Sequence, residues 1–282
     1  MNIHSNDRTR ISFGKLSDPG VLQRSPLATD ELHRKYFTSR NFQYIADHIA
    51  EMFGLAHGSI QATVVWNDLQ FGWLDKNQNS QMDAGEIVMQ FSMNAAINTY
   101  SRASFYGAHF MHHTATQYGY PVIFGIVAHE IGHLINRYTM ATLETQIVGG
   151  QSVLMQTSQL QAHWDELCAD YLAGIVLSKA SPRLSQNPMI ESLRYSQSDA
   201  DHPDGFWRVY AIEMGHQWGC GNSPALASRI LTNTQYVRQL LTSFCQIYYN
   251  QIYCAVSPHI RSQYSSLSSV FSIPCAIALD RL

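Results

Sequence analysis

The chain has 282 residues, of which 45% are hydrophobic and only 14% are charged, and this composition excludes a disordered protein. Its formal net charge of −3 excludes general electrostatic binding to nucleic acid or to an acidic membrane. Because no window of eighteen residues is free of charged and polar side chains, we expect no membrane-spanning helix.

The N-terminus and the cysteines point to a cytoplasmic protein. The first residues, Met-Asn-Ile-His-Ser-Asn-Asp-Arg, have no apolar run after their charges, so we expect no secretory signal. The five cysteines show no Cys-x-x-Cys spacing, which argues against a thiolate zinc site, and their odd number favours reduced thiols. Four of them lie in the last quarter of the chain, where one or two disulfides are the alternative: Cys220, Cys245, Cys254 and Cys275.

Composition divides the chain into three regions. Residues 1–28 are polar and contain proline and glycine turn markers, so we expect an extended lead-in. Residues 29–256 hold the regular apolar patterns and are expected to form one domain, since no linker or internal repeat divides them. Residues 257–282 form a Ser-rich tail that we expect to pack on the domain or to be loosely ordered.

The first half of the domain is predicted to contain one long helix and two strands. Apolar residues recur at helical spacing up to Phe53, with Thr29 or Asp30 as the capping residue. Residues 59–66 are rich in β-branched side chains, and residues 86–93 alternate between two kinds of side chain, so both segments are predicted to be strands.

The loop between these strands has the spacing of a calcium-binding loop. Oxygen-bearing side chains stand at positions 1, 3, 5, 9 and 12 of an EF-hand-like pattern: Asp75, Asn77, Asn79, Asp83 and Glu86. Ser80 replaces the glycine that the sharp turn of this pattern needs, and the flanking segments are predicted strands instead of helices. A solvated hairpin with Asx turns is the alternative to a Ca²⁺ site.

The helix that begins at Pro121, and is predicted to end near Arg137, carries the strongest motif. It contains His129, Glu130 and His133 in the order His-Glu-x-x-His. Two histidines four residues apart lie on one face of a helix, so both rings can reach one metal ion. The intervening glutamate points about 100° around the helix, where it can act as a base beside the metal. The alternative is a buried helix with two hydrogen-bonded core histidines.

A second long helix is predicted from about Ser152 to Ala180. Its Glu166 and Asp170 share a face, and two carboxylates on an apolar helix need a cation opposite them. A catalytic zinc site needs a third protein ligand, and four candidates lie here: His163, Asp165, Glu166 and Asp170. Glu166 fits best, because Asp170 one turn later can accept the free ring N–H of a ligand histidine. An exposed acidic edge is the alternative.

A further helix is expected after His202-Pro203, because proline is favoured in a first helical turn, with Asp201 or His202 as the cap. The residues between this helix and the previous one, from Ser185 to Ser198, are polar and are expected to be irregular.

The order His129-Glu-Ile-Gly-His133 followed by Glu166-x-x-Ala169-Asp170 resembles the gluzincin metallopeptidases. Within them the chain is most similar to the M48-type peptidases and to a family of neutral zinc metallopeptidases. The string Glu-Leu-Gln-Ala-Asp-Cys-x-Ala-Gly of that second family is similar to Glu-Leu-Cys-Ala-Asp-Tyr-Leu-Ala-Gly here. The His-Pro pair, with Arg208 and Gly215 beyond it, resembles the His-Pro or His-Gly motif that follows in both families, and the resemblance covers about residues 86–220.

The resemblance implies roles for these residues. It implies His129, His133 and Glu166 as zinc ligands, Glu130 as the general base, and Asp170 as the partner of a ligand. It also implies an edge strand before the active helix, at Glu86–Asn94 in this chain, to which a peptide substrate adds as an extra strand. The M48-type integral-membrane peptidases have spanning helices that we do not expect here, so their substrates are not implied.

Peptide hydrolysis also needs a donor that faces the developing oxyanion. His202 is the leading candidate by its position after the third ligand, followed by Arg208 and Tyr210. A helix cap is the alternative role for His202.

The sequence therefore predicts an α+β fold that is predominantly helical, with a zincin-like core, a small antiparallel sheet and a facing helix that bears Glu166. The expected function is that of a soluble zinc-dependent metalloendopeptidase acting on a polypeptide substrate, with one catalytic Zn²⁺. A regulatory zinc protease specific for one partner protein is the first alternative. A non-catalytic binding module with the same fold is the second, and the presence of Glu130 and of all three ligands disfavours it.

Overall fold

The computed structural model describes residues 11–12, 37–66, 68, 71–74, 88–90, 94–147, 158–180, 188–199, 201–222, 240–241 and 244. Several predictions fall outside these residues: the lead-in apart from Ile11 and Ser12, the calcium-loop pattern at 75–86, the tail at 257–282, and Cys245, Cys254 and Cys275. Of the remaining cysteines, Cys168 is buried and Cys220 is exposed.

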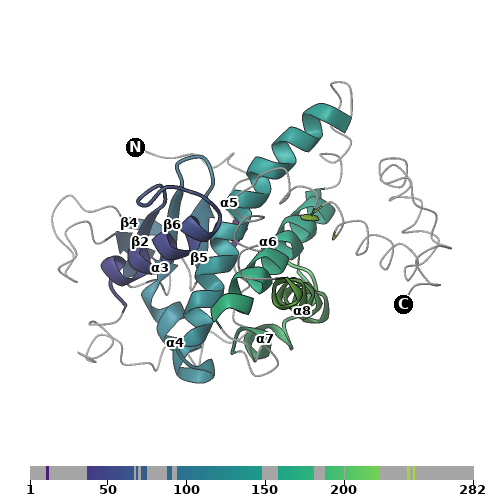
Figure 1. Ribbon diagram of the computed structural model, residues 1–282. Coiled ribbons are helices and arrows are strands. Elements are labelled where there is room, and N and C mark those ends of the chain that lie inside the picture. The colour runs from purple at the N-terminus through teal and green to yellow at the C-terminus, as the bar shows by residue number, and fades with distance from the viewer. Residues whose placement is uncertain are drawn as a thin grey trace.

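A mixed sheet lies on one side of the molecule and most of the helices lie on the other (Figure 1). The elements in chain order are β1 (Ile11–Ser12), α3 (Ser39–Met52), β2 (Gln61–Trp66), β3 (Phe71–Leu74), β4 (Val88–Gln90), β5 (Ala95–Asn98), β6 (Ala103–Gly107), α4 (Ala108–Tyr118), α5 (Pro121–Ile147), α6 (Ser158–Ala180), α7 (Pro188–Leu193) and α8 (Gly205–Gly221). The predominantly helical α+β class is confirmed. No helix of the described chain is long and apolar enough to cross a membrane.

The sheet has the strand order β1-β5-β6-β2-β3-β4. All neighbouring strands are antiparallel except β2 and β6, which pair in parallel with Gln61 opposite Ala103. The prediction of an antiparallel sheet is therefore wrong in this respect. The cause is the β5–β6 hairpin, which adds to the free edge of β2 through its second strand and so returns in the direction of β2.

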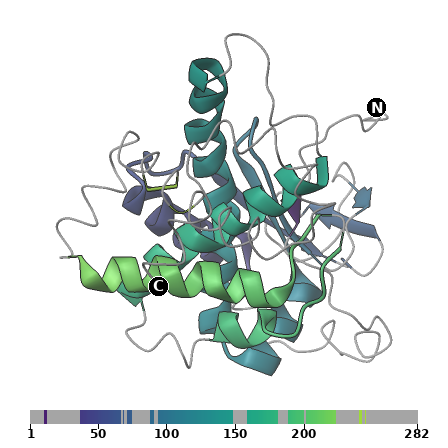
Figure 2. The same ribbon diagram turned by 90° about the vertical axis from the view of Figure 1, so that its right-hand side faces the viewer.

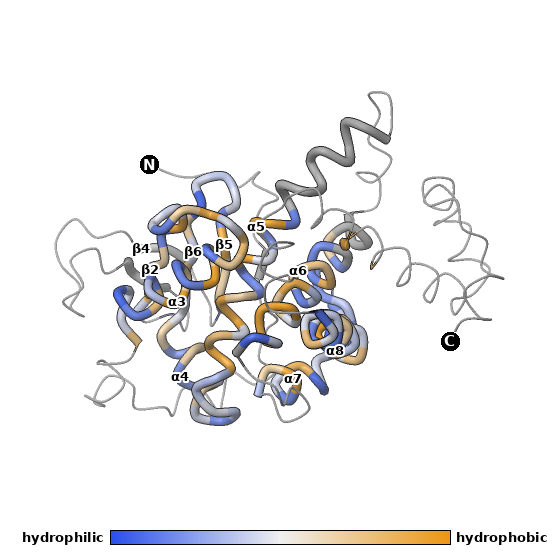
Figure 3. Tube along the Cα trace, in the orientation of Figure 1, coloured by the Kyte–Doolittle hydropathy of each residue, from blue (hydrophilic) through white to orange (hydrophobic). Residues whose placement is uncertain are grey.

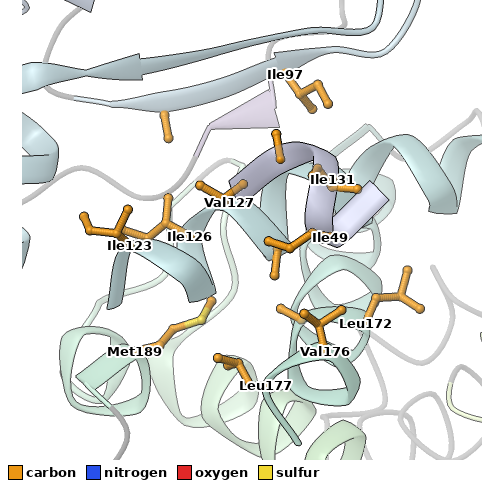
Figure 4. Packing of buried hydrophobic residues seen from close by; sticks show 14 of the residues in the cluster. Ile49, Ile97, Ile123, Ile126, Val127, Ile131, Leu172, Val176, Leu177 and Met189 are labelled. Carbon is orange, nitrogen blue, oxygen red and sulfur yellow. The ribbon is translucent and has the colours of Figure 1, made fainter. Parts of the chain in front are cut away.

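The predicted edge strand at Glu86–Asn94 corresponds to β4, which is the last strand of this order. Helix α5, however, packs on β5 at the other end of the sheet. Figure 4 shows Ile97 of β5 beside Ile131 of α5. The strand that packs on α5 is thus Ala95–Asn98, and its outer edge pairs with β1. The predicted edge strand within Glu86–Asn94 thus lies at an end of the described sheet, and the addition of a peptide to it stays a prediction.

Helix α3 begins ten residues after the predicted cap at Thr29. Phe37 and Thr38 are not helical, and the Thr38 side chain accepts a hydrogen bond from the backbone N–H of Asn41 at 3.2 Å. Phe37, just before this cap, packs its ring 6.3 Å from that of Phe42. This is the staple that fixes a helix start, and α3 accordingly begins at Ser39.

The later helices also differ from prediction at their ends. Helix α5 has Pro121 at its first position, as predicted, but it continues to Ile147 instead of ending near Arg137. Helix α7 lies in the segment expected to be irregular. Helix α8 is capped by Asp204, whose side chain accepts from the backbone N–H of Phe206 at 2.8 Å, and neither Asp201 nor His202 is the cap.

Helix α5 runs through the middle of the core. From Val122 to Ile135 its apolar residues are 0–7% exposed, except for the half-buried Phe124. They pack with the sheet on one side and with α6 and α7 on the other, as Ile126, Leu172 and Met189 show in Figure 4. Figure 3 shows the apolar colour along these facing helices, and Figure 2 shows α8 lying across the view below the projecting end of α5. A helix that is apolar on every side is expected at such a buried position.

Candidate metal centre

Helices α5 and α6 bring the motif residues together because they cross at very small side chains. A Cβ atom on Gly132 would lie 2.9 Å from the backbone oxygen of Ala169 and 3.0 Å from its Cα, closer than side chains normally pack. Residue numbers rise along α5 where they fall along α6, so His129 faces Asp170 and His133 faces Glu166. The absence of a side chain at Gly132 therefore lets Glu166 and Asp170 of α6 come within reach of the histidines.

Helix α8 approaches α6 in the same way. A Cβ atom on Gly174 would collide with the backbone oxygen of Ile212, and one on Gly215 would collide with that of Tyr171. The two backbones can come this close only because both positions are glycine. The approach places Arg208, near the start of α8, over Glu166 and Asp170.

The two histidines and Glu166 converge on one point. The Nε2 atoms of His129 and His133 are 3.0 Å apart. The carboxylate of Glu166 places Oε2 3.4 Å from Nε2 of His129 and Oε1 3.4 Å from Nε2 of His133. One ligand atom from each residue lies within 4.8 Å of the others, and all three side chains are buried, so these residues could hold a metal ion. We refer to His129, His133 and Glu166 as the metal group.

The donor set of this group fits a cation better than it fits a core without one. Two imidazole nitrogens that face each other at 3.0 Å cannot both direct lone pairs at the same point unless a proton or a cation lies between them. Two imidazoles and one carboxylate are also a ligand set typical of catalytic zinc sites, with one coordination position left open.

Asp170 holds the ring of His129 in the orientation that a metal needs. Its Oδ1 atom is 2.8 Å from Nδ1 of His129, and both side chains are fully buried. A carboxylate this close to Nδ1 favours a proton on that nitrogen, which leaves Nε2 to face Glu166 and His133. The predicted role of Asp170 as the partner of a ligand agrees with this geometry.

Arg208 neutralises the two carboxylates. Its Nε donates to Oδ2 of Asp170 at 2.7 Å and its Nη2 donates to Oδ1 at 3.1 Å, while Nη2 also lies 3.2 Å from Oε2 of Glu166. The side chain is fully buried. Burial would raise the pKa of Glu166, but the Arg208 guanidinium and the two histidines hold it well below its usual value. Both acids are therefore charged ligands or acceptors, and neither stores a proton.

The two histidines differ in charge in the metal-free protein. Burial alone would lower the pKa of His129, but the carboxylates of Asp170 and Glu166 outweigh it and raise this pKa to about 9. For His133 burial prevails and lowers the pKa to about 4. His129 is thus an imidazolium at neutral pH in the metal-free protein. A divalent cation that binds Nε2 has to displace the proton on that nitrogen.

Glu130 lies beside this group, as its offset on the helix predicts. It is fully buried, and among the described residues its two carboxylate oxygens accept no hydrogen bond. Burial raises its pKa to about 8. A carboxylate whose pKa lies near neutrality, and whose oxygens are not engaged elsewhere, is suited to accept and return a proton.

His202 reaches the edge of the site from the turn before α8. Its Nδ1 atom lies 2.9 Å and 3.1 Å from the two carboxylate oxygens of Asp199, and its Nε2 atom lies 3.8 Å from Oε1 of Glu166. The Asp199 carboxylate thus fixes the orientation of this ring. The side chain is only 5% exposed, and its Nε2 faces the metal group.

The other predicted candidates point elsewhere. Nε2 of His163 lies 2.9 Å from the backbone oxygen of Asp199, and Asp165 accepts a hydrogen bond from Asn136, so neither joins the metal group. Arg208, a second choice as the oxyanion donor, is engaged with the two carboxylates. Tyr210 stands about 200° around α8 from Arg208 and contacts Trp207.

Two residues of this arrangement were not predicted. Asp199 orients His202, and a local signal for it exists, because an aspartate three residues before a histidine can reach the ring within one turn. Asn136 follows His133 by three residues on the same face of α5, and a polar residue on an apolar face was the only signal for it.

Comparison with known proteins yields no match: no protein-family model, no curated protein and no solved structure matches this chain.

Proposed function

We propose that this protein is a zinc-dependent metalloendopeptidase. The observation that carries the proposal is the buried group of His129, His133 and Glu166, beside which Glu130 stands with carboxylate oxygens that no other described residue engages in a hydrogen bond. A structural metal site needs four protein ligands and no adjacent base. A three-ligand group with a glutamate of raised pKa beside it supports hydrolysis instead.

The chemistry divides between the metal and the chain. A zinc ion held at this group would polarise the scissile carbonyl and lower the pKa of a water molecule toward neutrality. Glu130 takes the proton of the attacking water on a carboxylate oxygen and later delivers it to the leaving amine. His202, with Asp199 behind it, donates from Nε2 toward the oxyanion that develops on the substrate.

The proposed substrate is an extended segment of polypeptide. Strand β5 (Ala95–Asn98) packs on α5, and backbone N–H and C=O groups at a sheet edge can pair with an added strand. In this conformation β1 occupies that edge. His129, Glu130, His133 and Glu166 are 0–1% exposed, so hydrolysis needs an opened form in which a substrate can reach them.

The same burial favours a second candidate function, a regulatory protease that opens for one partner protein. Such an enzyme would use the same residues and the same chemistry. The two candidates differ in whether an unstructured protein such as casein is sufficient as a substrate.

The proposal is tested by comparing wild-type protein with Glu130→Gln. The variant should keep its zinc, because Glu130 is not part of the metal group, and it should lose casein hydrolysis by a factor of at least about 100. Equal hydrolysis by both proteins contradicts the role of Glu130. Zinc-loaded wild-type protein that leaves casein intact contradicts the general endopeptidase and leaves the second candidate.

A further inference from the structure

Four contacts join α5 to α6 in succession along the two helices. His129 contacts Asp170, Gly132 contacts Ala169, His133 contacts Glu166, and Asn136 contacts Asp165. The first and third contacts belong to the proposed metal site. The last contact involves none of the three residues that could hold a metal ion, so the proposed site does not account for it.

This last contact is a part-buried hydrogen bond to a charged group. Nδ2 of Asn136 donates to Oδ1 of Asp165 at 2.9 Å, and Asn136 is 2% exposed. Asp165 directly precedes Glu166 on α6, so the two carboxylates point about 100° apart around the helix. One of them therefore reaches the metal group and the other reaches Asn136.

This hydrogen bond lies directly beside Glu166 along both helices. At Gly132 the backbone of α5 approaches the backbone of Ala169 so closely that a Cβ atom would have no room, and this is where the two helices come together most tightly around the site. The ion pair between His129 and Asp170 lies on one side of this close approach. The hydrogen bond between Asn136 and Asp165 lies on the other side, where Glu166 contacts His133.

We propose that Asn136 is a positioning residue which, through its bond to Asp165, sets the distance at which Glu166 meets the two histidines. It acts on metal binding through Asp165 and Glu166 and touches no reacting atom. The inference rests on the proposed function only in so far as the group binds zinc, and it is independent of the substrate.

The variant Asn136→Asp places a second carboxylate against Asp165 and replaces the hydrogen bond by repulsion. Adding Asp165→Asn reverses the pair, because the new asparagine donates to the new aspartate across the same gap. The measurement is the zinc dissociation constant of the full chain, from competition with a chelator. The single variant should bind zinc about 10- to 100-fold more weakly, and the reversed pair should return to within about threefold of wild type.

A spectroscopic signal separates positioning from simple destabilisation. The visible spectrum of the Co²⁺-substituted protein should change in Asn136→Asp and return in the reversed pair. The control is Gln217→Glu, which adds the same charge at an exposed position of α8 and should change neither the zinc affinity nor the spectrum.

Two outcomes overturn the inference. One is a zinc affinity in Asn136→Asp equal to that of wild type, while wild type binds zinc, which leaves the proposed function intact. The other is a reversed pair that binds zinc as weakly as the single variant. Wild-type protein that binds no zinc overturns the proposed function first, and the inference with it.

Discussion

Arg208 shows at the scale of one residue how this site tolerates its own charge. Two carboxylates, Glu166 and Asp170, are 1% and 0% exposed, and an isolated ion so deep in a protein is very costly. The guanidinium contacts both of them, and its planar fork matches the Asp170 carboxylate with two hydrogen bonds. Arg208 thereby keeps both acids ionised before any metal arrives.

Replacing Arg208 by methionine should destabilise the metal-free protein by about 3–5 kcal/mol, because two buried carboxylates lose their compensating charge. Added zinc should restore part of this loss, since it supplies positive charge at the same place. Chemical unfolding with and without zinc measures both effects.

Arg194→Met provides the matched control for this experiment. Arg194 pairs with Glu191 at 2.9 Å, but both side chains are more than 40% exposed, so its loss should change stability by less than about 1 kcal/mol. An Arg208→Met variant no less stable than this control would contradict the buried role of the guanidinium.

At the scale of elements, glycines set how closely the three functional helices approach. Gly132 lies between the two histidines of the motif and faces the backbone of Ala169. Gly174 and Gly215 do the same between α6 and α8. The ligands of the proposed site come from helices whose separation depends on these missing side chains.

Gly132→Ala should therefore push α6 away from the histidines. The added Cβ meets backbone atoms at 2.9–3.0 Å, which cannot move aside as a flexible side chain would. We expect a loss of about 1–3 kcal/mol in stability, together with weaker zinc binding. Thermal unfolding and chelator competition measure the two effects.

Gly221→Ala is the control, because a Cβ atom there has no heavy atom within 4 Å. It should leave both quantities unchanged. Zinc binding by Gly132→Ala as tight as that of this control would show that the helix separation does not govern the site.

At the scale of the whole molecule, the buried charges couple stability to pH. The pKa of His129 is raised from 6.5 to about 9 in the folded, metal-free protein, so its contribution is complete below pH 6.5 and is lost as pH rises through 9. The pKa of Glu130 is raised from 4.5 to about 8, so its contribution falls over that interval in the same direction. Both groups therefore favour the metal-free fold less as pH rises.

The metal-free protein should thus lose thermal stability steadily from pH 6.5 to pH 9. Zinc requires an unprotonated His129, so its stabilising effect should grow over the same range. Thermal unfolding at several pH values, with and without zinc, gives the difference. A difference in midpoint that stays constant between pH 6.5 and pH 9 would contradict the assignment of the proton to His129.

The sequence predicts which site residues share a helix face, but it does not predict the contacts between residues on different helices. The spacing of His129 and His133, and that of Glu166 and Asp170, is set within one helix, so their shared faces follow from helical geometry alone. The bond from Asn136 to Asp165 spans 29 residues, and the bond from His163 to the backbone of Asp199 spans 36. Neither could be predicted without knowing how the helices cross.

The fold was predictable to a similar extent. The helix class follows from apolar periodicity, whereas β5 and β6 (Ala-Ala-Ile-Asn and Ala-Ser-Phe-Tyr-Gly) are short and poor in β-branched residues. Their pairing depends on packing against α5 and β2, so the mixed sheet could not be predicted from their own residues. The early start predicted for α3 failed because a cap at Thr38 competes with continued helix.

The central claim is that His129, His133 and Glu166 together bind one zinc ion. The most direct test is the zinc content of purified wild-type protein and of single alanine variants after dialysis against a weak chelator. We predict about one zinc per chain for wild type and for His163→Ala, and little or none for His133→Ala and Glu166→Ala. Zinc retained by Glu166→Ala but lost by His163→Ala would contradict the claim, because the third ligand would then be a different residue.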